Sequence, residues 1–156
     1  MTKIVLGIDP GLADTGYGII KVEGPRLSCL AYGSIKTPAK MELSARLQIL
    51  HLKLDQIIKK YRPQTVGIEQ LFFNKNVTTA LTVGQARGVA LLTVYQNGLV
   101  AHDFTPAQVK RAVCAYGQAT KQQVQKMVRL TLNLQEIPKP DDAADALAVA
   151  LATLNK

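Results

Sequence analysis

Cysteine and histidine are scarce in this chain, which has two of each among its 156 residues. Cys29 and Cys114 lie far apart in the sequence, and neither has His51 or His102 near it. This shortage excludes a disulfide framework and argues against a structural zinc site. We therefore expect two small core thiols and two ordinary histidines.

Long apolar runs are missing as well. No run approaches the ~20 residues of a membrane span. The first residues do not form a charged segment followed by an apolar stretch and a cleavage site. These absences predict a cytoplasmic protein. A length of 156 residues suits one core, so we predict a single domain over residues 1–156.

Acidic residues are few, with 11 Asp and Glu against 19 Lys and Arg, and the net charge is +8. Residues 71–135 hold a single acid, Asp103, whereas residues 136–156 hold four acids and two lysines. The seven bases of the middle segment are Lys75, Arg87, Lys110, Arg111, Lys121, Lys126 and Arg129. A basic middle segment favours a polyanionic partner such as nucleic acid, and a merely basic, solvated surface is the alternative.

The hydrophobic periodicity predicts an α/β fold. Three early strands with short connections favour an antiparallel trio, and helical patterns precede two later strands. Because such crossovers are right-handed, the later strands should run parallel to the first. The expected strands are 3–8, 16–23, 27–35, 65–69 and 99–104; the expected helices are 42–61, 77–96, one from Thr105 toward Gly117, and two opening near Thr120 and Asp141. We predict a mixed five-stranded sheet, three strands antiparallel and two parallel, flanked by helices.

Four carboxylates fall where this topology would bring them together. Asp9 and Glu69 end two of the parallel strands, whose carboxyl ends form sites in such folds. Asp142 and Asp145 are three residues apart and so share one helix face. A cluster of this kind repels itself unless cations are present, and all-oxygen ligands select magnesium or manganese over zinc. Two such ions can hydrolyse a phosphodiester.

Each acid also has a simpler interpretation. Asp142 is suited to capping its helix, with Asp145 in the favourable first turn. Asp9 stands before Pro-Gly and is suited to starting a turn. Glu69 is harder to explain in this way, because an unpaired carboxylate at the end of a buried strand is costly. The coincidence of all of them favours the shared site.

Four segments resemble one protein family. They read "GIDPGLADTGYG", "IEQLFFNKNVTTALTVGQARGVAL", "TPAQVKRAV" and "DDAADALAVAL", and the match runs from about residue 4 to residue 153. They are similar to the RuvC family of bacterial Holliday junction resolvases, which have a ribonuclease H-like fold. The resemblance implies a homodimer that nicks two strands of like polarity in a four-way DNA junction during recombination and repair.

The resemblance also implies a cofactor and a further partner. The cofactor would be Mg²⁺, with Mn²⁺ as a substitute and two ions in each active site, and the partner a branch-migration helicase complex. The family's catalytic and metal-binding quartet falls on Asp9, Glu69, Asp142 and Asp145. Asp141 precedes the third of these, and whether it contributes is open.

The resemblance assigns DNA contacts too. The family's aromatic after the Glu-Gln pair falls on Phe72, which would stack on bases at the opened crossover. Phe73 is the competitor, because successive residues of an extended segment face opposite ways. The family's functional lysines are similar to Lys110 and Lys121, the latter near the scissile phosphate and counted as catalytic. Lys75 and Arg87 are further predicted DNA contacts.

Three other residues have less certain roles. Asp14 is expected to be exposed rather than a ligand. Gly84 and Gly88 lie four apart on one helix face, so another backbone can approach there. That backbone belongs either to a second subunit or to the chain's own sheet.

Two other classes of function compete with the nuclease. One is a junction-binding module without chemistry, in which the acids only cap helices. The other is an actin-like nucleotide-binding protein, whose fold also begins with a strand ending in Asp-x-Gly, but whose two lobes need far more than 156 residues. The complete acidic quartet favours the nuclease over both.

Overall fold

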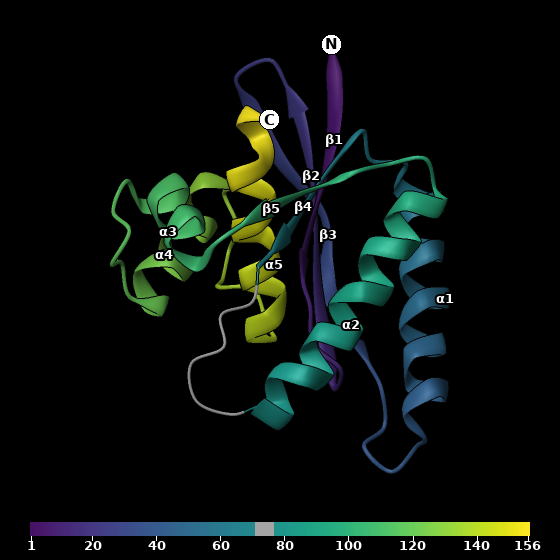
Figure 1. Ribbon diagram of the computed structural model, residues 1–156. Helices are drawn as coiled ribbons and strands as arrows, with labels where there is room; N and C mark the ends of the chain where they lie inside the picture. Colours follow the sequence, from purple (N-terminus) through teal and green to yellow (C-terminus); the bar gives the residue numbers. More distant parts are fainter. Residues whose placement is uncertain (71–76) are drawn as a thin grey trace.

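A computed structural model describes residues 1–70 and 77–156. Five helices pack on the two faces of a five-stranded sheet (Figure 1). The strands are β1 (Thr2–Asp9), β2 (Asp14–Glu23), β3 (Arg26–Lys36), β4 (Thr65–Glu69) and β5 (Ala101–Phe104). The helices are α1 (Leu43–Tyr61), α2 (Val77–Gln96), α3 (Pro106–Cys114), α4 (Lys121–Thr131) and α5 (Asp141–Ala152), followed by the short 3₁₀ helix η1 (Thr153–Asn155).

The strand order is β3-β2-β1-β4-β5, and the predicted mixed sheet is confirmed. The first three strands are antiparallel, whereas β4 and β5 run parallel to β1. Ile8 of β1 pairs with Ile68 of β4, so the next residues, Asp9 and Glu69, end adjacent strands. The register alone therefore brings two of the predicted carboxylates side by side.

Two predicted boundaries differ from the structure. β5 begins at Ala101 rather than at residue 99, because the Leu99 amide still donates to the Val94 carbonyl of the preceding helix. α3 ends at Cys114 and not near Gly117, since Ala115 already has left-handed backbone angles. The predicted openings of α3 and α4 are correct, and each has a complete capping box.

The helices divide between the faces of the sheet. α1 and α2 cover one face, and α5 lies on the other with α3 and α4 outside it (Figure 1). Nine of the twelve residues of α5 are buried, which is expected of a helix enclosed on all sides. Only its acidic residues at positions 141, 142 and 145 escape full burial, and all of them lie near its N-terminus.

Glycines let α5 approach the sheet closely. A Cβ at Gly7 would collide with the backbone carbonyl of Ala146, and one at Gly16 with the carbonyl of Asp142. Both strands therefore need a residue without a side chain where the helix crosses them. The contact at Gly16 fixes the first turn of α5, including Asp142, against the end of β2.

Gly7→Ala is expected to lower the free energy of unfolding by about 2 kcal/mol, because the added methyl overpacks the contact with α5. Chemical denaturation measures the change. Gly24→Asn is the matched control, since Gly24 has a φ of 58° with nothing near its Cβ position and Asn tolerates that conformation. Equal losses in the two variants would contradict the close-packing account.

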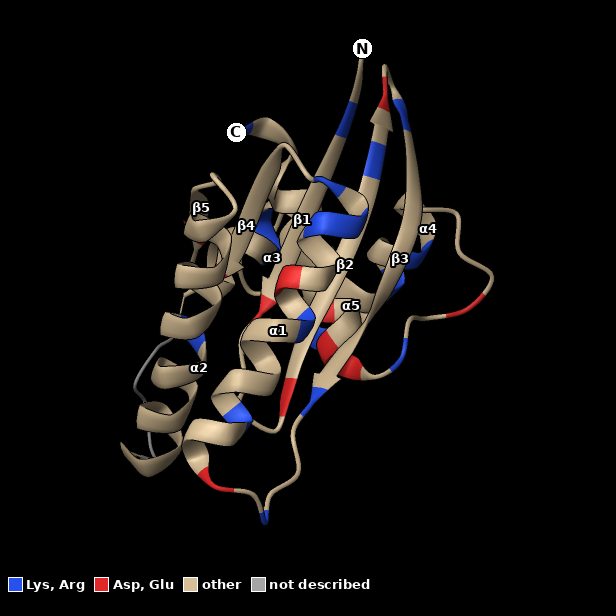
Figure 2. Cartoon of the chain, turned by 90° about the vertical axis from the view of Figure 1, so that its right-hand side faces the viewer, with Lys and Arg blue, Asp and Glu red and all other residues tan. Residues whose placement is uncertain are grey.

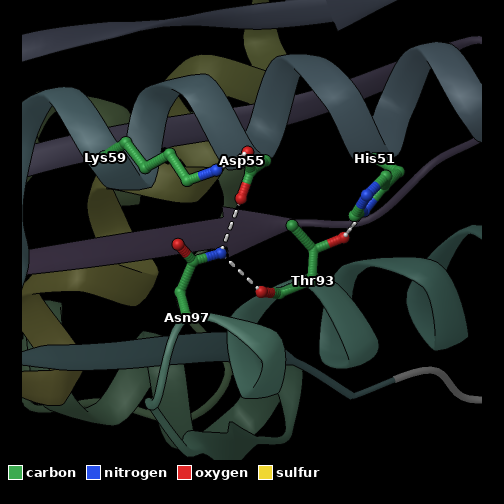
Figure 3. A network of polar contacts seen from close by, with 5 residues as sticks. All are labelled: His51, Asp55, Lys59, Thr93 and Asn97. Carbon is green, nitrogen blue, oxygen red and sulfur yellow. Dashed lines mark hydrogen bonds and ion pairs between the residues drawn. The ribbon is translucent and has the colours of Figure 1, made fainter.

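A polar network ties α1 to α2 (Figure 3). The His51 Nδ1 lies 2.8 Å from the Thr93 hydroxyl oxygen. Asn97 donates to both the Asp55 carboxylate and the Thr93 carbonyl, each at 2.9 Å. Hydrogen bonds from Lys59 and Asn97 hold the pKa of Asp55 below its ordinary value. These bonds give His51 a structural partner on α2 and fix the spacing of the two helices.

One described helix, α2, is long and apolar on average, although it holds no continuous apolar run. It has 20 residues and a mean hydropathy of 1.2 over its most apolar window, which by length and composition is enough to cross a membrane, and 22% of that window is buried. In the sequence, Gly, Thr and the charged Arg87 interrupt the apolar residues of this helix. Ala86 and Ala90 face the core, whereas Leu81 and Leu92 are exposed. One apolar face of α2 is thus left uncovered by the described residues.

Candidate active site

The predicted carboxylates meet at one end of the sheet, on the α5 side. One oxygen from each of Asp9, Asp142 and Asp145 lies within 4.8 Å of the others. Glu69 lies close enough to Asp9 for its charge to raise the pKa of that carboxyl. Three elements, β1, β4 and the first turns of α5, therefore supply one acidic cluster.

The capping interpretation of Asp142 is wrong, and the turn after β1 has hydrogen bonds that do not involve Asp9. The N-cap of α5 is Pro140, without a side-chain capping bond, so Asp142 does not cap this helix. The turn after β1 is closed by Thr15, whose hydroxyl contacts both the amide and the carbonyl of Gly11. Asp9 is thus left to face the other carboxylates, and its place in the cluster is not explained by local turn chemistry.

The cluster is electrostatically strained. Burial, followed by repulsion from Glu69 and Asp145, raises the pKa of Asp9 to about 9. Burial is also the largest cause of the raised pKa of Glu69, Asp142 and Asp145. So many carboxylates cannot all be ionised near neutral pH without compensating positive charge. This oxygen-only donor set fits hard divalent cations such as Mg²⁺ or Mn²⁺.

Lys110 and Lys121 lie beside the acids. Both line a cavity of about 230 Å³ together with Glu69 and Asp145. The Lys121 Nζ lies 3.2 Å from an Asp141 oxygen and 3.7 Å from an Asp145 oxygen. Burial lowers the pKa of Lys121, but these carboxylates outweigh it and raise the pKa overall. Carboxylates and ammonium groups thus line the same cavity.

Asp141 and Asp14 both point to partners outside the carboxylate group. Asp141 pairs with Lys121 and accepts a hydrogen bond from Gln125 at 3.3 Å. Asp14 accepts a hydrogen bond from the Ser34 hydroxyl at 3.0 Å. Neither belongs to the group of Asp9, Asp142 and Asp145. In this arrangement the partners of Asp141 are Lys121 and Gln125, and a part for Asp141 in metal binding stays a prediction.

The remaining predicted DNA contacts lie elsewhere. Arg87 on α2 forms an ion pair with Asp103 of β5. Phe72, its competitor Phe73, and Lys75 fall within residues 71–76, outside the described residues. Their roles stay predictions.

A sheet in the order β3-β2-β1-β4-β5, flanked by these helices, is the fold of the ribonuclease H-like class, and the acids at the ends of β1 and β4 and on α5 form a carboxylate cluster that suggests a metal site. A family model described as "Crossover junction endodeoxyribonuclease RuvC" matches residues 5–153. The chain belongs to the RuvC family of crossover junction endodeoxyribonucleases.

Relatives match along nearly their whole length. The enzyme of the same name from Heliobacterium modesticaldum is 61% identical over 148 residues, which cover 95% of this chain and 91% of that protein. The one from Ruminiclostridium cellulolyticum is 55% identical, covering 95% and 89%. The structure of Thermus thermophilus RuvC in complex with a Holliday junction substrate is 34% identical, with a TM-score of 0.91 over 96% of this chain and 92% of that one.

Sequence reasoning missed two features that shape this site. Gly16 admits the first turn of α5, and Asp141 holds Lys121. For Gly16 the signal was present, because a glycine inside a strand marks a close approach. Asp141 gave a weaker signal, since nothing in the sequence says which way the first turn of α5 faces.

In a chelating buffer, the free energy of unfolding is expected to fall as the pH rises from 5 to 9. The raised pKa of Asp9, about 9, means that the folded chain holds a proton which the unfolded chain has already released. The stability that this proton provides is therefore lost across this range. We expect the melting temperature to drop by at least about 10 °C, and the drop to shrink in Mg²⁺.

Thermal melts at several pH values measure this dependence. Asp9→Asn is the matched variant, because it removes the titrating group and should flatten the profile. A wild-type melting temperature that is constant or rises over this range would contradict the assignment.

Proposed function

We propose that this chain resolves four-way DNA junctions by metal-dependent hydrolysis, placing symmetric nicks in two strands of like polarity. The acidic cluster beside two lysines carries the proposal, because it combines groups that bind metal ions with groups that bind phosphate. The likeness to a RuvC structure that contains a Holliday junction substrate supports the choice of DNA.

The metal would be held by Asp9, Glu69, Asp142 and Asp145. Their raised pKa values support this assignment, since a bound cation removes the repulsion that burial enforces. We infer two Mg²⁺ ions per site, replaceable by Mn²⁺. When bound, such ions lower the pKa of a water and stabilise the leaving oxygen of the phosphodiester.

The lysines would act on the DNA. Lys121 holds its ammonium between two carboxylates and above the cavity, where a phosphate could enter. Lys110 lines the same cavity, and its charge partly offsets the burial that raises the pKa of Glu69. We infer that Lys121 contacts the scissile phosphate and Lys110 a neighbouring one. Phe72, Lys75 and Arg87 complete the proposed DNA contacts.

Lys121→Met is expected to slow single-turnover cleavage by about 100-fold, because it removes a charge from beside the reacting phosphate. Asp141→Asn should slow cleavage only a few-fold, since Asp145 still holds the lysine. Quenched-flow cleavage at saturating enzyme measures both rates. A larger loss in Asp141→Asn than in Lys121→Met would contradict these roles and make Asp141 the more important group.

A homodimer is the second part of the proposal. Paired nicks in a two-fold symmetric substrate need two copies of the domain. The uncovered face of α2 supports a dimer. Its exposed residues are spaced three or four positions apart, so they form one stripe along the helix that the rest of the described chain does not cover. They are Leu81, Gly84, Gly88, Leu92 and Tyr95. No described atom lies within 4 Å of a Cβ built at Gly84 or Gly88. These two glycines therefore do not serve a close approach of α2 to the chain's own sheet.

We further infer a cytoplasmic location and work alongside a branch-migration helicase complex. Both inferences rest on family membership alone. A pull-down of that complex from a bacterial extract with the tagged wild type and with Gly88→Arg would test the helicase partner.

The substrate preference tests the proposed function. A synthetic four-way junction and a linear duplex with the same arm sequences are each incubated with the chain and Mg²⁺. We expect cleavage of the junction and little of the duplex. Equal cleavage of both would leave a nuclease without junction selectivity, and cleavage of neither would favour a binding module.

A further inference from the structure

The strand β3 is an open edge of unusual length. It is the outer strand of the sheet and pairs only with β2 among the described residues. Its eleven residues carry charge only at the ends, at Arg26 and Lys36. Leu30 in the middle is 43% exposed and lies at a β-bulge, which divides the regular edge into Arg26–Cys29 and Ala31–Lys36. The opposite edge, β5, has four residues and includes a charge, Asp103. Sheets usually protect an edge like β3, because its free amides and carbonyls invite another strand.

A cavity of about 330 Å³ lies between this edge and α1. Figure 2 views the molecule from this side, with α1 in front of the sheet and β3 as the outer strand. The polar residues that line the cavity are Tyr17, Ser34, Lys53, Gln56, Lys60 and Tyr61. No acidic residue lines it, and neither lysine forms an ion pair within the described part of the chain. The cavity therefore offers uncompensated positive charge.

The tyrosine from β2 reaches the sheet edge through a gap in β3. A Cβ at Gly33 would lie 2.9 Å from the Tyr17 hydroxyl oxygen, so glycine leaves room for the ring. Burial raises the pKa of Tyr17, which keeps the hydroxyl protonated and able to donate. No residue in the described ranges accepts a hydrogen bond from it. Together with Lys53, Lys60 and Tyr61, it makes the cavity rich in donors for a carboxylate.

The cavity and the acidic cluster lie on opposite faces of the sheet. Tyr17 belongs to the α1 side, whereas its neighbour Gly16 contacts α5. A molecule bound at the cavity would therefore leave the cleavage site open. A space of this size holds a side chain, and the strand beside it offers backbone pairing, so the pair of features suits an extended peptide better than a DNA arm.

We propose that β3 and this cavity form a docking site for an extended acidic segment of a partner protein. The segment adds to β3 as a sixth strand, and an Asp or Glu side chain on the α1 side enters the cavity. Backbone hydrogen bonds supply affinity, and Lys53, Lys60 and the two tyrosines select the carboxylate. The site is independent of the nuclease activity, because it shares no residue with the acidic cluster.

The probe is an eight-residue peptide of alternating Glu and Val, titrated into the ¹⁵N-labelled full chain. We expect NMR shift changes at β3 and around the cavity, and slower amide hydrogen exchange along β3. A peptide with Lys in place of Glu tests the charge. The Glu–Val peptide methylated on alternate backbone nitrogens tests strand addition. Both are expected to bind at least about tenfold more weakly.

Variants then separate this site from the other surfaces. Lys53→Gln with Lys60→Gln should weaken the Glu–Val peptide about tenfold and leave junction cleavage unchanged. Lys40→Gln, a change at an exposed lysine outside the cavity, is the matched control. Equal affinity for the Glu and Lys peptides, or no binding of either, would overturn the proposal. So would a loss of junction affinity in the double variant, which would assign the surface to DNA, or β3 shifts that depend only on protein concentration, which would assign it to a second copy.

Discussion

Asp9→Asn is expected to slow junction cleavage at least about 100-fold while making the chain more stable in a chelating buffer. The loss follows from removing the carboxylate that interacts electrostatically with all three other acids of the cluster. The gain follows from the raised pKa of Asp9, about 9, because at pH 8 the chain must take up a proton at this position to fold, and an uncharged amide needs none. We expect a gain of about 1 kcal/mol or more at pH 8.

The measurements are single-turnover cleavage in Mg²⁺ and chemical denaturation in a chelating buffer, with junction binding followed in parallel. Asp14→Asn is the matched control, since Asp14 lies in the same segment but bonds to Ser34. It should cleave at nearly the wild-type rate. If Asp9→Asn lowered both the cleavage rate and the stability, the role of Asp9 would be merely structural, which would contradict this account.

Gly88→Arg is expected to convert the chain to monomers and to uncouple the two nicks. A long charged side chain fits the monomer, because nothing described lies near that position, but it cannot fit between two α2 helices in close contact. Individual strands should still be cut, since α2 carries none of the acids of the cluster. The fraction of junctions cut on both strands during one binding event should fall to near zero.

Sedimentation and strand-specific labelling measure these two effects. Gln48→Arg places the same side chain on the exposed face of α1 and serves as the control. A Gly88→Arg protein that remains dimeric and still makes paired nicks would move the interface away from α2. Loss of folding, seen by circular dichroism, would show that the glycine serves the monomer instead.

Local sequence signals predicted the sheet and the acids well. The strands ending in Asp9 and Glu69 carry continuous apolar runs, and parallel strands place their carboxyl ends together whatever the loops do. The helix with Asp142 and Asp145 needed only a three-residue spacing. These parts of the site follow from periodicity and topology.

Other parts of the site depend on how the helices are oriented relative to one another, and hydrophobic periodicity does not predict that orientation. The pairing of Lys121 with Asp141 needs α4 and α5 to meet at a particular angle. The free face of α2 is apolar in sequence, just as a buried face would be. The sequence alone therefore did not show whether Gly84 and Gly88 lie on a buried face or on a free one. The cavity beneath β3 joins residues from three elements, and no single motif marks it.

The dependence of cleavage on both metal and acids tests the central claim most directly. Single-turnover cleavage of a four-way junction, with each strand labelled in turn, is measured for the wild type and Asp9→Asn in Mg²⁺, in Mn²⁺ and in a chelator. We predict symmetric nicks in two strands of like polarity for the wild type in either metal, and none in the chelator or in the variant. Wild-type cleavage that persists in the chelator, or Asp9→Asn cleavage at the wild-type rate, would contradict the account.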